Sequence, residues 1–439
     1  MGIKVAKFGG SSVADTIQFS KVKDIILADP SRRYVVVSAP GKRFDQDTKM
    51  TDLLLLCHTH LMNHLPWDQL FQVVCDRFSA IAFTLDIGAD KLDLQAEYNK
   101  IKHAMEDGAG SDYIASRGEY LSARLIAAYL GWDFIDAADV IKFDERGRFL
   151  AEETNSILKE ELKKHEYAVI PGFYGAKPDG KIKTFSRGGS DISGSIVARA
   201  AEAEVYENWT DVNGFLMANP KIVKNPKPIR YISYQELREL SYMGANVMHE
   251  DAIFPVKEAG IPINIRNTNE PDHPGTFIQD KTPQECMGVI TGVAGSKNFT
   301  VIAMHKYMMN SERGFMKRVF SILDSNDVSF EHMPTGIDTL SVVLDNDEVG
   351  NKLPDIIEDI KRTLEPDMLE VYDDIAMIAT VGQGMTYRPG VAAKLFAALA
   401  EQGINIRMID QGSSEINIIV GVAGSDFEKA ICAIYNAFN

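Results

Sequence analysis

The chain has 439 residues and a formal net charge of −16, with 45% hydrophobic and 25% charged residues. This length allows two or three domains, and the composition is that of an ordinary globular protein. The negative charge argues against nucleic acid or an anionic membrane as a main partner. The four cysteines show no CxxC spacing, and the chain shows neither a secretory signal nor a membrane-spanning apolar run. We therefore expect a cytoplasmic protein with reduced thiols.

A glycine-rich loop lies near the start of the chain, at residues 7–12 (KFGGSS). It follows the apolar run Ile3–Ala6 and precedes an amphipathic stretch from Val13, which predicts a strand, a tight loop and a helix. Backbone N–H groups of the glycines and the helix N-terminus can hold phosphate, and Lys7 adds a cation. In the usual P-loop the lysine follows the glycines, so this loop taken alone is also consistent with an ordinary turn.

Strand and helix patterns alternate from residue 1 to about residue 283. The expected strands are Tyr34–Val37, Ala168–Gly172, Val205–Trp209 and Ile261–Ile265. The expected helices are Asp52–His64, Gln69–Leu85, Ser193–Glu204 and Glu236–Met243. This alternation predicts an α/β fold with a mainly parallel sheet covered on both faces. Such sheets bind ligands beyond the carboxyl ends of their strands, so chemistry is expected in the loops after Ala6, Val37, Ile170 and Trp209.

An internal repeat follows the α/β region. Two similar helical stretches begin at Gly314 and Gly390, 76 residues apart. The same offset relates expected strands at 328–330 and 404–406, and at 340–342 and 416–418. Each unit would read helix, turn, strand, loop, strand. Because each unit is too small to bury much core, we expect the two to pack together and across a dimer axis.

A second glycine-rich loop occupies residues 186–191 (SRGGSD). The Arg187 guanidinium can hold a substrate carboxylate through two parallel hydrogen bonds. Asp191, in the first turn of the following helix, can position a cation or an attacking group. Helix capping alone would explain Ser190 and Asp191, but it does not explain the Arg-Gly-Gly sequence before them.

Glu119 precedes an expected helix over Tyr120–Leu130. A carboxylate near a helix N-terminus is favourable without any function. The alternative is that Glu119 receives the ammonium group of an amino acid whose carboxylate is held by Arg187.

Two further polar loops follow strands. Residues 209–214 (WTDVNG) end a strand and can contact a nucleotide, although Asn-Gly is also an ordinary turn signal. Residues 38–42 (SAPGK), with Thr51 further on, form a third polar loop at the same edge of the sheet.

The sequence shows no sign of nucleophilic catalysis. It has no GxSxG motif, no cysteine beside a base, and no metal-ligand spacing among its nine histidines. Two glycine-rich loops with Lys and Arg, together with several acids, describe phosphoryl transfer, which needs positioning and charge neutralisation. Lys7 would stabilise the transferred phosphoryl group and the glycine N–H groups would cradle its oxygens. A Mg²⁺ ion bridging the nucleotide phosphates is implied.

Four motifs in this order, followed by a tandem repeat, resemble aspartate kinase. They lie at residues 7–12, 117–119, 185–191 and 209–212. The resemblance covers essentially the whole chain. It implies a three-layer αβα amino-acid-kinase (carbamate-kinase-like) domain at 1–283, followed by two α+β ACT regions at 284–370 and 371–439. It also implies a monofunctional enzyme that phosphorylates the β-carboxylate of L-aspartate with ATP, giving 4-phospho-L-aspartate, the first step of lysine, threonine and methionine biosynthesis.

The resemblance assigns site residues by position and implies no metal ligand from the protein. The catalytic residues would be Lys7 and Asp191. The aspartate contacts would be Thr51, Glu119, Phe173, Arg187 and Ser190. The ATP contacts would be Lys7, Phe8, Gly9, Gly10, Ser11, Thr210, Asp211, Leu216, Lys221, Asn246 and Val247.

Three of the ATP positions depart from the family pattern. Leu216 stands where the family often has tyrosine, Lys221 where it has arginine, and Asn246 where it has lysine. These positions would lie at the rim of the ATP site. Losing one cation and exchanging another there should weaken nucleotide binding and leave the chemistry at Lys7 and Asp191 unchanged. Mutations at this rim should therefore change the KM for ATP more than turnover.

The repeats resemble the regulatory part of the family. The inhibitor-binding edge would be formed by Met309, Gly314, Phe315, Met316, Ser329, Phe330, Glu331 and Thr335. We expect lysine, alone or together with threonine, to favour an inactive arrangement of a homodimer or homotetramer formed through the ACT regions.

Two other functions remain open at this point. Another amino-acid kinase, such as glutamate 5-kinase or acetylglutamate kinase, is disfavoured by Glu119 and by the ACT pair. An inactive amino-acid sensor is disfavoured by the presence of Lys7, Arg187 and Asp191.

Overall fold

The computed structural model describes residues 2–186, 188–244, 248 and 252–439. These residues form two compact units, each described separately below. The first takes the described residues of 1–215, 230–234 and 247–282, and the second takes those of 216–229, 235–246 and 283–439. Three predicted site residues, Arg187, Asn246 and Val247, lie outside the described residues. Within the described ranges, no helix is long and apolar enough to cross a membrane.

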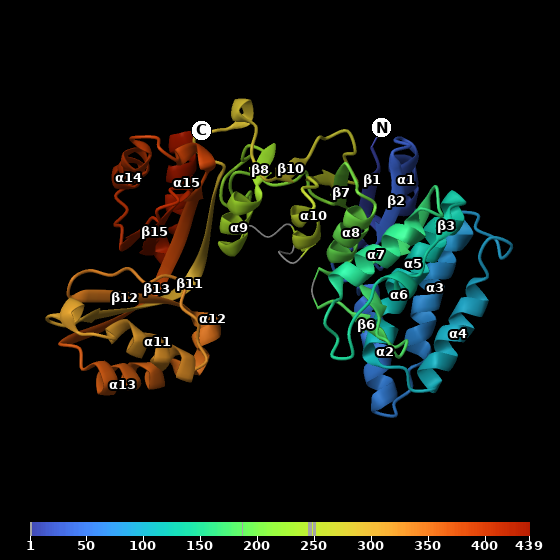
Figure 1. Cartoon of the computed structure of the whole chain (residues 1–439), viewed down its shortest axis with the longest axis horizontal. Helices are drawn as coiled ribbons and strands as arrows, with labels where there is room; N and C mark the ends of the chain where they lie inside the picture. Colours follow the sequence, from blue (N-terminus) through green and yellow to red (C-terminus); the bar gives the residue numbers. More distant parts are fainter. Residues whose placement is uncertain (1, 187, 245–247, 249–251) are drawn as a thin grey trace. The chain divides into compact units, whose positions relative to one another are not determined.

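An eight-stranded sheet forms the centre of the first unit (Figure 1), in the order β3-β4-β2-β1-β7-β9-β10-β8. Its strands are β1 (Lys4–Phe8), β2 (Arg32–Val37), β3 (Asp133–Phe134), β4 (Ala168–Pro171), β7 (Val205–Thr210), β8 (Tyr231–Ser233), β9 (Ile263–Asn267) and β10 (Thr276–Gln279). All neighbours pair in parallel except β9 and β10. The expected, mainly parallel sheet is confirmed. Strands β2 and β4 are apolar over residues 34–37 and 168–171, as expected for strands whose two faces are both buried.

Helices cover the two faces of this sheet. The side chains of β7 alternate between the faces: Tyr206 and Asn208 meet α8 (Gly189–Ala200), whereas Trp209 points to the opposite face and stacks on Phe8. On the α8 face, α7 (Ala151–Leu162) and α10 (Phe254–Glu258) pack against α8. The unit is thus a three-layer αβα domain.

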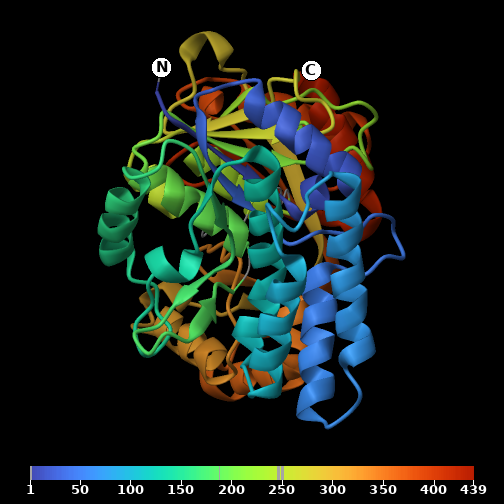
Figure 2. The ribbon, with the colours of Figure 1, turned by 90° about the vertical axis from the view of Figure 1, so that its right-hand side faces the viewer.

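A second group of helices packs beside one another in the same unit, as Figure 2 shows. They are α1 (Thr16–Leu27), α2 (Met50–Met62), α3 (Asp68–Thr84), α4 (Leu94–Glu106) and α5 (Ser111–Leu130). Shorter elements complete the unit: the helix α6 (Ala137–Val140) and a hairpin of β5 (Tyr174–Ala176) and β6 (Ile182–Thr184).

Helix α5 corrects one sequence-based expectation. It begins at Ser111, so Glu119 lies in the middle of the helix and not before it. A glycine inside a helix costs about 1 kcal/mol relative to alanine. In the structure Gly118 allows a close approach, because a Cβ at this position would lie 2.7 Å from the Cβ of Ala39. The helices expected near residues 52–64 and 69–85 match α2 and α3 to within two residues.

The second unit is built on an antiparallel five-stranded sheet, in the order β12-β11-β13-β15-β14. Its strands are β11 (Gly292–His305), β12 (Thr339–Asp345), β13 (Met368–Val381), β14 (Met408–Asp410) and β15 (Asn417–Ala423). Its helices are α11 (Phe315–Ser325), α12 (Asn346–Val349), α13 (Leu353–Leu364), α14 (Val391–Glu401) and α15 (Phe427–Phe438), with most of α9 (Tyr234–Tyr242).

The repeat is confirmed in its helices and in one of its two pairs of strands. The equivalent helices α11 and α14 are 76 residues apart, and the equivalent strands β12 and β15 lie within two residues of that offset. The strands expected at 328–330 and 404–406 are wrong. In the second repeat the strand is β14, a few residues later, and in the first repeat only isolated bridges from His332 and Thr335 occur.

The two central strands of this sheet each serve both repeats. Residues 299–305 of β11 pair with β12, whereas residues 292–296 pair only with the far end of β13. In the same way, residues 375–381 of β13 pair with β15. Asn298 (φ +84°) and Asp374 (φ +56°) mark the irregular register where the two halves of these strands meet.

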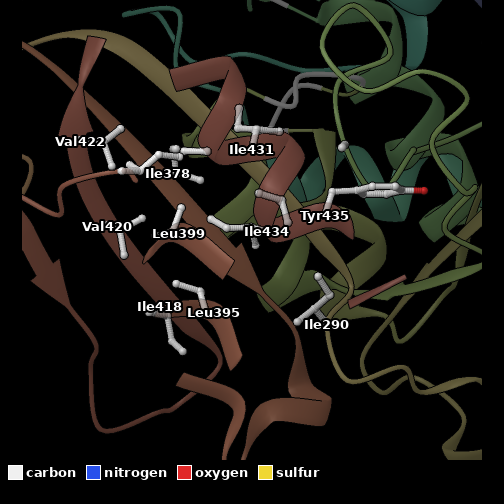
Figure 3. Close-up of a cluster of buried hydrophobic side chains, with 14 of the residues drawn as sticks. Ile290, Ile378, Leu395, Leu399, Ile418, Val420, Val422, Ile431, Ile434 and Tyr435 are labelled. Atoms are coloured by element: carbon white, nitrogen blue, oxygen red, sulfur yellow. The ribbon is translucent and has the colours of Figure 1, made fainter. Parts of the chain in front are cut away.

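One hydrophobic cluster of the second unit includes residues from the middle of the chain. Figure 3 shows Leu395 and Leu399 of α14, and Ile431 and Ile434 of α15, facing the apolar side chains of the sheet. Ala218 and Val223 belong to the same cluster. The Tyr435 hydroxyl accepts a hydrogen bond from the backbone N–H of Lys227 (2.9 Å). Residues 216–229 are therefore part of this core.

Candidate active site

Four loops meet at the carboxyl edge of the parallel strands in the first unit. The N–H of Gly9 donates to the carbonyl of Trp209 at the end of β7 (2.9 Å), and the N–H of Ser38 donates to the carbonyl of Phe8 at the end of β1 (3.1 Å). The N–H of Gly172, after β4, donates to the carbonyl of the last residue of β2 (3.0 Å). The loops named from the sequence thus share one edge.

Lys7 and Asp191 form a buried ion pair at this edge. Lys7 is only 6% exposed, and its Nζ contacts Oδ1 of Asp191. Asp191 is the third residue of α8, where a negative charge is stabilised by the helix N-terminus. A Cβ at Gly9 would lie 3.5 Å from the lysine Nζ, so the ammonium group sits directly under the first glycine-rich loop.

Asn208 completes this pair and was missed from the sequence. Its Nδ2 donates to Oδ1 of Asp191 (2.9 Å), and the hydroxyl of Tyr206 donates to the Asp191 carbonyl (3.1 Å). An asparagine inside an otherwise buried strand was the available signal, because a buried polar side chain needs a partner.

Glu119 lies buried on α5 with an unsatisfied oxygen. It is 5% exposed, and in the described part of the chain its Oε2 has no hydrogen-bond partner. Burial raises the pKa of this carboxyl to about 8, although the N–H of Ala39 and the charges of Arg117 and Lys7 act in the opposite direction. A buried carboxyl in this state is suited to receive a cationic group of a ligand.

The loop after β4 and the first turn of α8 pack closely. Phe173 has φ +80°, and its N–H donates to Oγ of Ser193 (2.9 Å). A Cβ at Gly172 would lie 2.7 Å from the Ser190 Oγ, so the glycine allows these two segments to touch. Phe173 and Ser190 therefore lie on two segments that pack against each other.

The remaining predicted contacts are distributed over both units. Thr51 is the second residue of α2, next to the loop of residues 38–42. The Thr210 hydroxyl, at the end of β7, donates to Oδ1 of Asp211 (3.1 Å). The Phe8 ring is buried against Trp209, so only its backbone faces the loop edge. Leu216 and Lys221 belong to the second unit.

No metal centre is present in the protein side chains that the structure describes. They contain no group of three or more His, Cys, Asp or Glu residues able to hold an ion. A magnesium ion at this edge would have to be bound mainly by the phosphates of its nucleotide, which is the usual arrangement for this ion.

The predicted inhibitor edge lies in the first repeat of the second unit. Met309 and Phe315 are buried, and Gly314 (φ +77°) precedes α11. The Phe330 ring lies 5.5 Å from that of Phe320. The other members are Met316 in α11 and Ser329, Glu331 and Thr335 in the segment before β12.

Residues 2–267 match the amino acid kinase family, and residues 378–438 match the ACT domain. Aspartokinase 3 of Bacillus subtilis is 37% identical over 455 aligned residues, which cover 99% of this chain and 98% of that protein. The chain belongs to the aspartate kinases of the amino acid kinase family.

Solved structures agree with this membership. The aspartate kinase of Clostridium acetobutylicum is 53% identical, with a TM-score of 0.93 over the whole of both chains. Escherichia coli aspartokinase III has been solved with aspartate and ADP in an R-state (25% identity, TM-score 0.73) and with lysine and aspartate in a T-state (26%, 0.75); each alignment covers 99% of both chains. This aspartate kinase therefore carries kinase activity that is regulated allosterically through its ACT region.

Proposed function

We propose that this aspartate kinase transfers the γ-phosphoryl group of Mg·ATP to the β-carboxylate of L-aspartate at the edge where Lys7, Asp191 and Glu119 meet. The product would be 4-phospho-L-aspartate, which opens lysine, threonine and methionine biosynthesis. The observation that carries this proposal is the buried Lys7–Asp191 pair beside a buried, unsatisfied Glu119. The first gives a cation for the phosphate and the second gives a site for the substrate ammonium group.

Each group has a distinct role in this proposal. Lys7 stabilises the charge on the transferred phosphoryl oxygens, and the N–H groups of Gly9, Gly10 and Ser11 bind the phosphate oxygens. Asp191, held by Asn208, keeps the lysine in position. Thr51, Phe173, Arg187 and Ser190 complete the aspartate site, and Phe8, Thr210, Asp211, Leu216, Lys221, Asn246 and Val247 the nucleotide site.

Substrate choice is tested by trapping the acyl phosphate with hydroxylamine. The enzyme is incubated with ATP, Mg²⁺ and aspartate, glutamate or acetylglutamate in turn. We expect hydroxamate with aspartate alone. Hydroxamate with glutamate or acetylglutamate would indicate a different amino-acid kinase, and hydroxamate with none would support a sensor.

The role of Lys7 is tested by Lys7→Ala. Loss of the cation should lower kcat by orders of magnitude, because charge stabilisation in the transition state is removed. Aspartate binding, measured by calorimetry, should largely survive, since Glu119 and Arg187 are unchanged. An unchanged kcat would show that the first glycine-rich loop is an ordinary turn with no part in phosphoryl transfer.

We further propose that lysine, alone or together with threonine, is the effector. The support is the paired ACT repeats and the lysine present in the T-state structure of the Escherichia coli relative. On α9, the Tyr242 hydroxyl bonds to Glu331, so the predicted inhibitor edge contacts a helix outside the repeats. Titrating lysine and threonine against the initial rate tests this, and a flat response to both would refute it.

The remaining proposals concern assembly and location. We propose a homodimer or homotetramer formed through the regions 284–370 and 371–439, next to a catalytic domain at 1–283. Sedimentation velocity with and without lysine measures the state. A cytoplasmic location is consistent with the four free cysteines.

A further inference from the structure

Arg77 is a buried arginine on α3 to which neither the sequence nor the family resemblance assigned a role. It is 7% exposed, and burial lowers the pKa of its guanidinium. Arginine is rarely buried without partners that occupy its donors. The partners of Arg77 are unusual in kind, because most of them are backbone carbonyls.

These carbonyls belong to the segment after the first glycine-rich loop and to two places in the loop of residues 38–49. The Nη2 atom of Arg77 donates both to the carbonyl of Ala14 (2.9 Å) and to the carbonyl of Gly41. Nη1 donates to the carbonyl of Thr48 (3.3 Å) and lies 3.5 Å from Oδ2 of Asp47. Ala14 directly follows the short helix after the first glycine-rich loop, and Thr48 lies three residues before Thr51.

The Gly41 segment connects the other two. Its N–H donates to the carbonyl of Gly10 (2.8 Å), and a Cβ at Gly41 would lie 2.7 Å from the carbonyl carbon of the same residue. Two residues earlier, the N–H of Ala39 bonds to Glu119. The loop of residues 38–49 therefore lies between the phosphate loop and the proposed ammonium site.

We propose that Arg77 is a positioning residue for aspartate phosphorylation. Its planar guanidinium fixes the segment that follows the first glycine-rich loop and the two ends of the loop of residues 38–49 relative to one another. A guanidinium suits this task because it presents several donors in fixed directions, whereas a lysine ammonium does not. This inference rests on the proposed placement of the substrates at this edge.

The expected consequence is specific in its kinetics. Without Arg77 the loops that hold aspartate and the transferred phosphoryl group move apart, and misplacement by about 1 Å can lower a rate about a hundredfold. The nucleotide contacts Thr210 and Asp211 follow β7 and receive no bond from Arg77 in the described residues. We expect kcat to fall and the KM for aspartate to rise. The KM for ATP should rise less, because Thr210 and Asp211 stay in place although the phosphate loop shifts.

The test compares Arg77→Met and Arg77→Lys in the full-length enzyme. We expect Arg77→Met to lower kcat about tenfold to a hundredfold and to raise the KM for aspartate more than the KM for ATP. Arg77→Lys keeps the positive charge but loses the fixed set of N–H donors of the guanidinium. It should show a smaller change in the same direction. If Arg77→Met does not fold, Arg77→Lys decides.

Arg124→Met is the matched control. Arg124 is a partly buried arginine whose Nε has no partner among the described atoms. Unlike Arg77 it pairs with a side chain, Glu97 (3.0 Å), and the structure gives it no hydrogen bond to an active-site loop among the described residues. A purely structural role for Arg77 would lower only the folded fraction, as read from the unfolding midpoint, and leave both KM values unchanged. That result would overturn the inference.

Glu119→Gln, measured in parallel, separates this inference from the proposed function. A raised KM for aspartate in Glu119→Gln, with unchanged constants in both Arg77 variants, would refute only the positioning role. Unchanged aspartate constants in all three variants would refute the placement of the substrate as well.

Discussion

Glu119 shows how burial prepares a single residue for its ligand. Its carboxyl has a pKa of about 8, so in the free enzyme it is mainly protonated at neutral pH. In the proposed site the substrate ammonium group pairs with the ionised form, so aspartate binding would have to remove the proton.

The pH dependence of aspartate use follows from this. Below about pH 8, kcat/KM for aspartate should rise with pH, by at most about tenfold per unit, because the ionised fraction of Glu119 rises. Above that pH the curve should level off. In Glu119→Gln the constant should be lower and this rising limb should disappear. An identical limb in the variant would assign the ionisation to another group.

At the residue scale, the sequence named candidate site residues but not the partners with which they interact. Lys7 and Asp191 were both named, but nothing in a one-dimensional pattern showed that they form a pair. Asn208 and Arg77 were missed because their partners are distant in the sequence and, for Arg77, are backbone atoms that any residue carries.

At the scale of elements, the site depends on two glycines that let segments touch. Gly118 lets α5 approach Ala39, and Gly41 lets the loop of residues 38–49 lie on the backbone of Gly10. The sequence-based helix at Tyr120–Leu130 began nine residues later than α5 does. The alternation of strands and helices did not depend on these contacts, and the parallel sheet was predicted correctly.

Gly41→Ala tests the closeness of the two loops. The added Cβ would lie 2.7 Å from the carbonyl carbon and 2.8 Å from the oxygen of Gly10, so one loop must shift. We expect a stability loss of about 1–3 kcal/mol and a fall in kcat of about tenfold or more. Chemical denaturation and steady-state kinetics measure the two effects.

Gly110→Ala is the matched control, because its Cβ would meet nothing within 4 Å. It should leave kcat unchanged. Equal kinetic effects of the two substitutions would mean that the contact between the loops is not needed for turnover.

At the scale of the whole molecule, no sequence pattern indicated that the middle of the chain contributes to the regulatory core. Residues 216–229 carry Ala218 and Val223 into the hydrophobic cluster of the second unit. On α9, Glu236 accepts hydrogen bonds from Thr291 (2.6 Å) and from the N–H of Gln383 (2.8 Å). Burial against residues that are distant in the sequence produces no local periodicity that a sequence analysis could detect. The domain boundaries expected at residues 283 and 370 therefore stay a prediction.

A fragment of residues 1–282 tests this arrangement. It would keep the sheet of the first unit but would expose the apolar side chains of residues 216–229 to water. We expect it to aggregate and to bind the dye ANS, which reports exposed apolar surface. The full chain under the same conditions is the control. A monomeric fragment that binds no dye and unfolds cooperatively would show that residues 216–229 can be buried without the second unit.

The shared strands of the regulatory sheet have a consequence for how such enzymes can be recombined. Residues 292–296 of β11 pair with the end of β13, so the second repeat is completed by a strand that precedes the first repeat in the chain. A cut between the repeats leaves that strand without its neighbour. A chimera that exchanges regulation between relatives should therefore take β11, both repeats, residues 216–229 and α9 from the same donor.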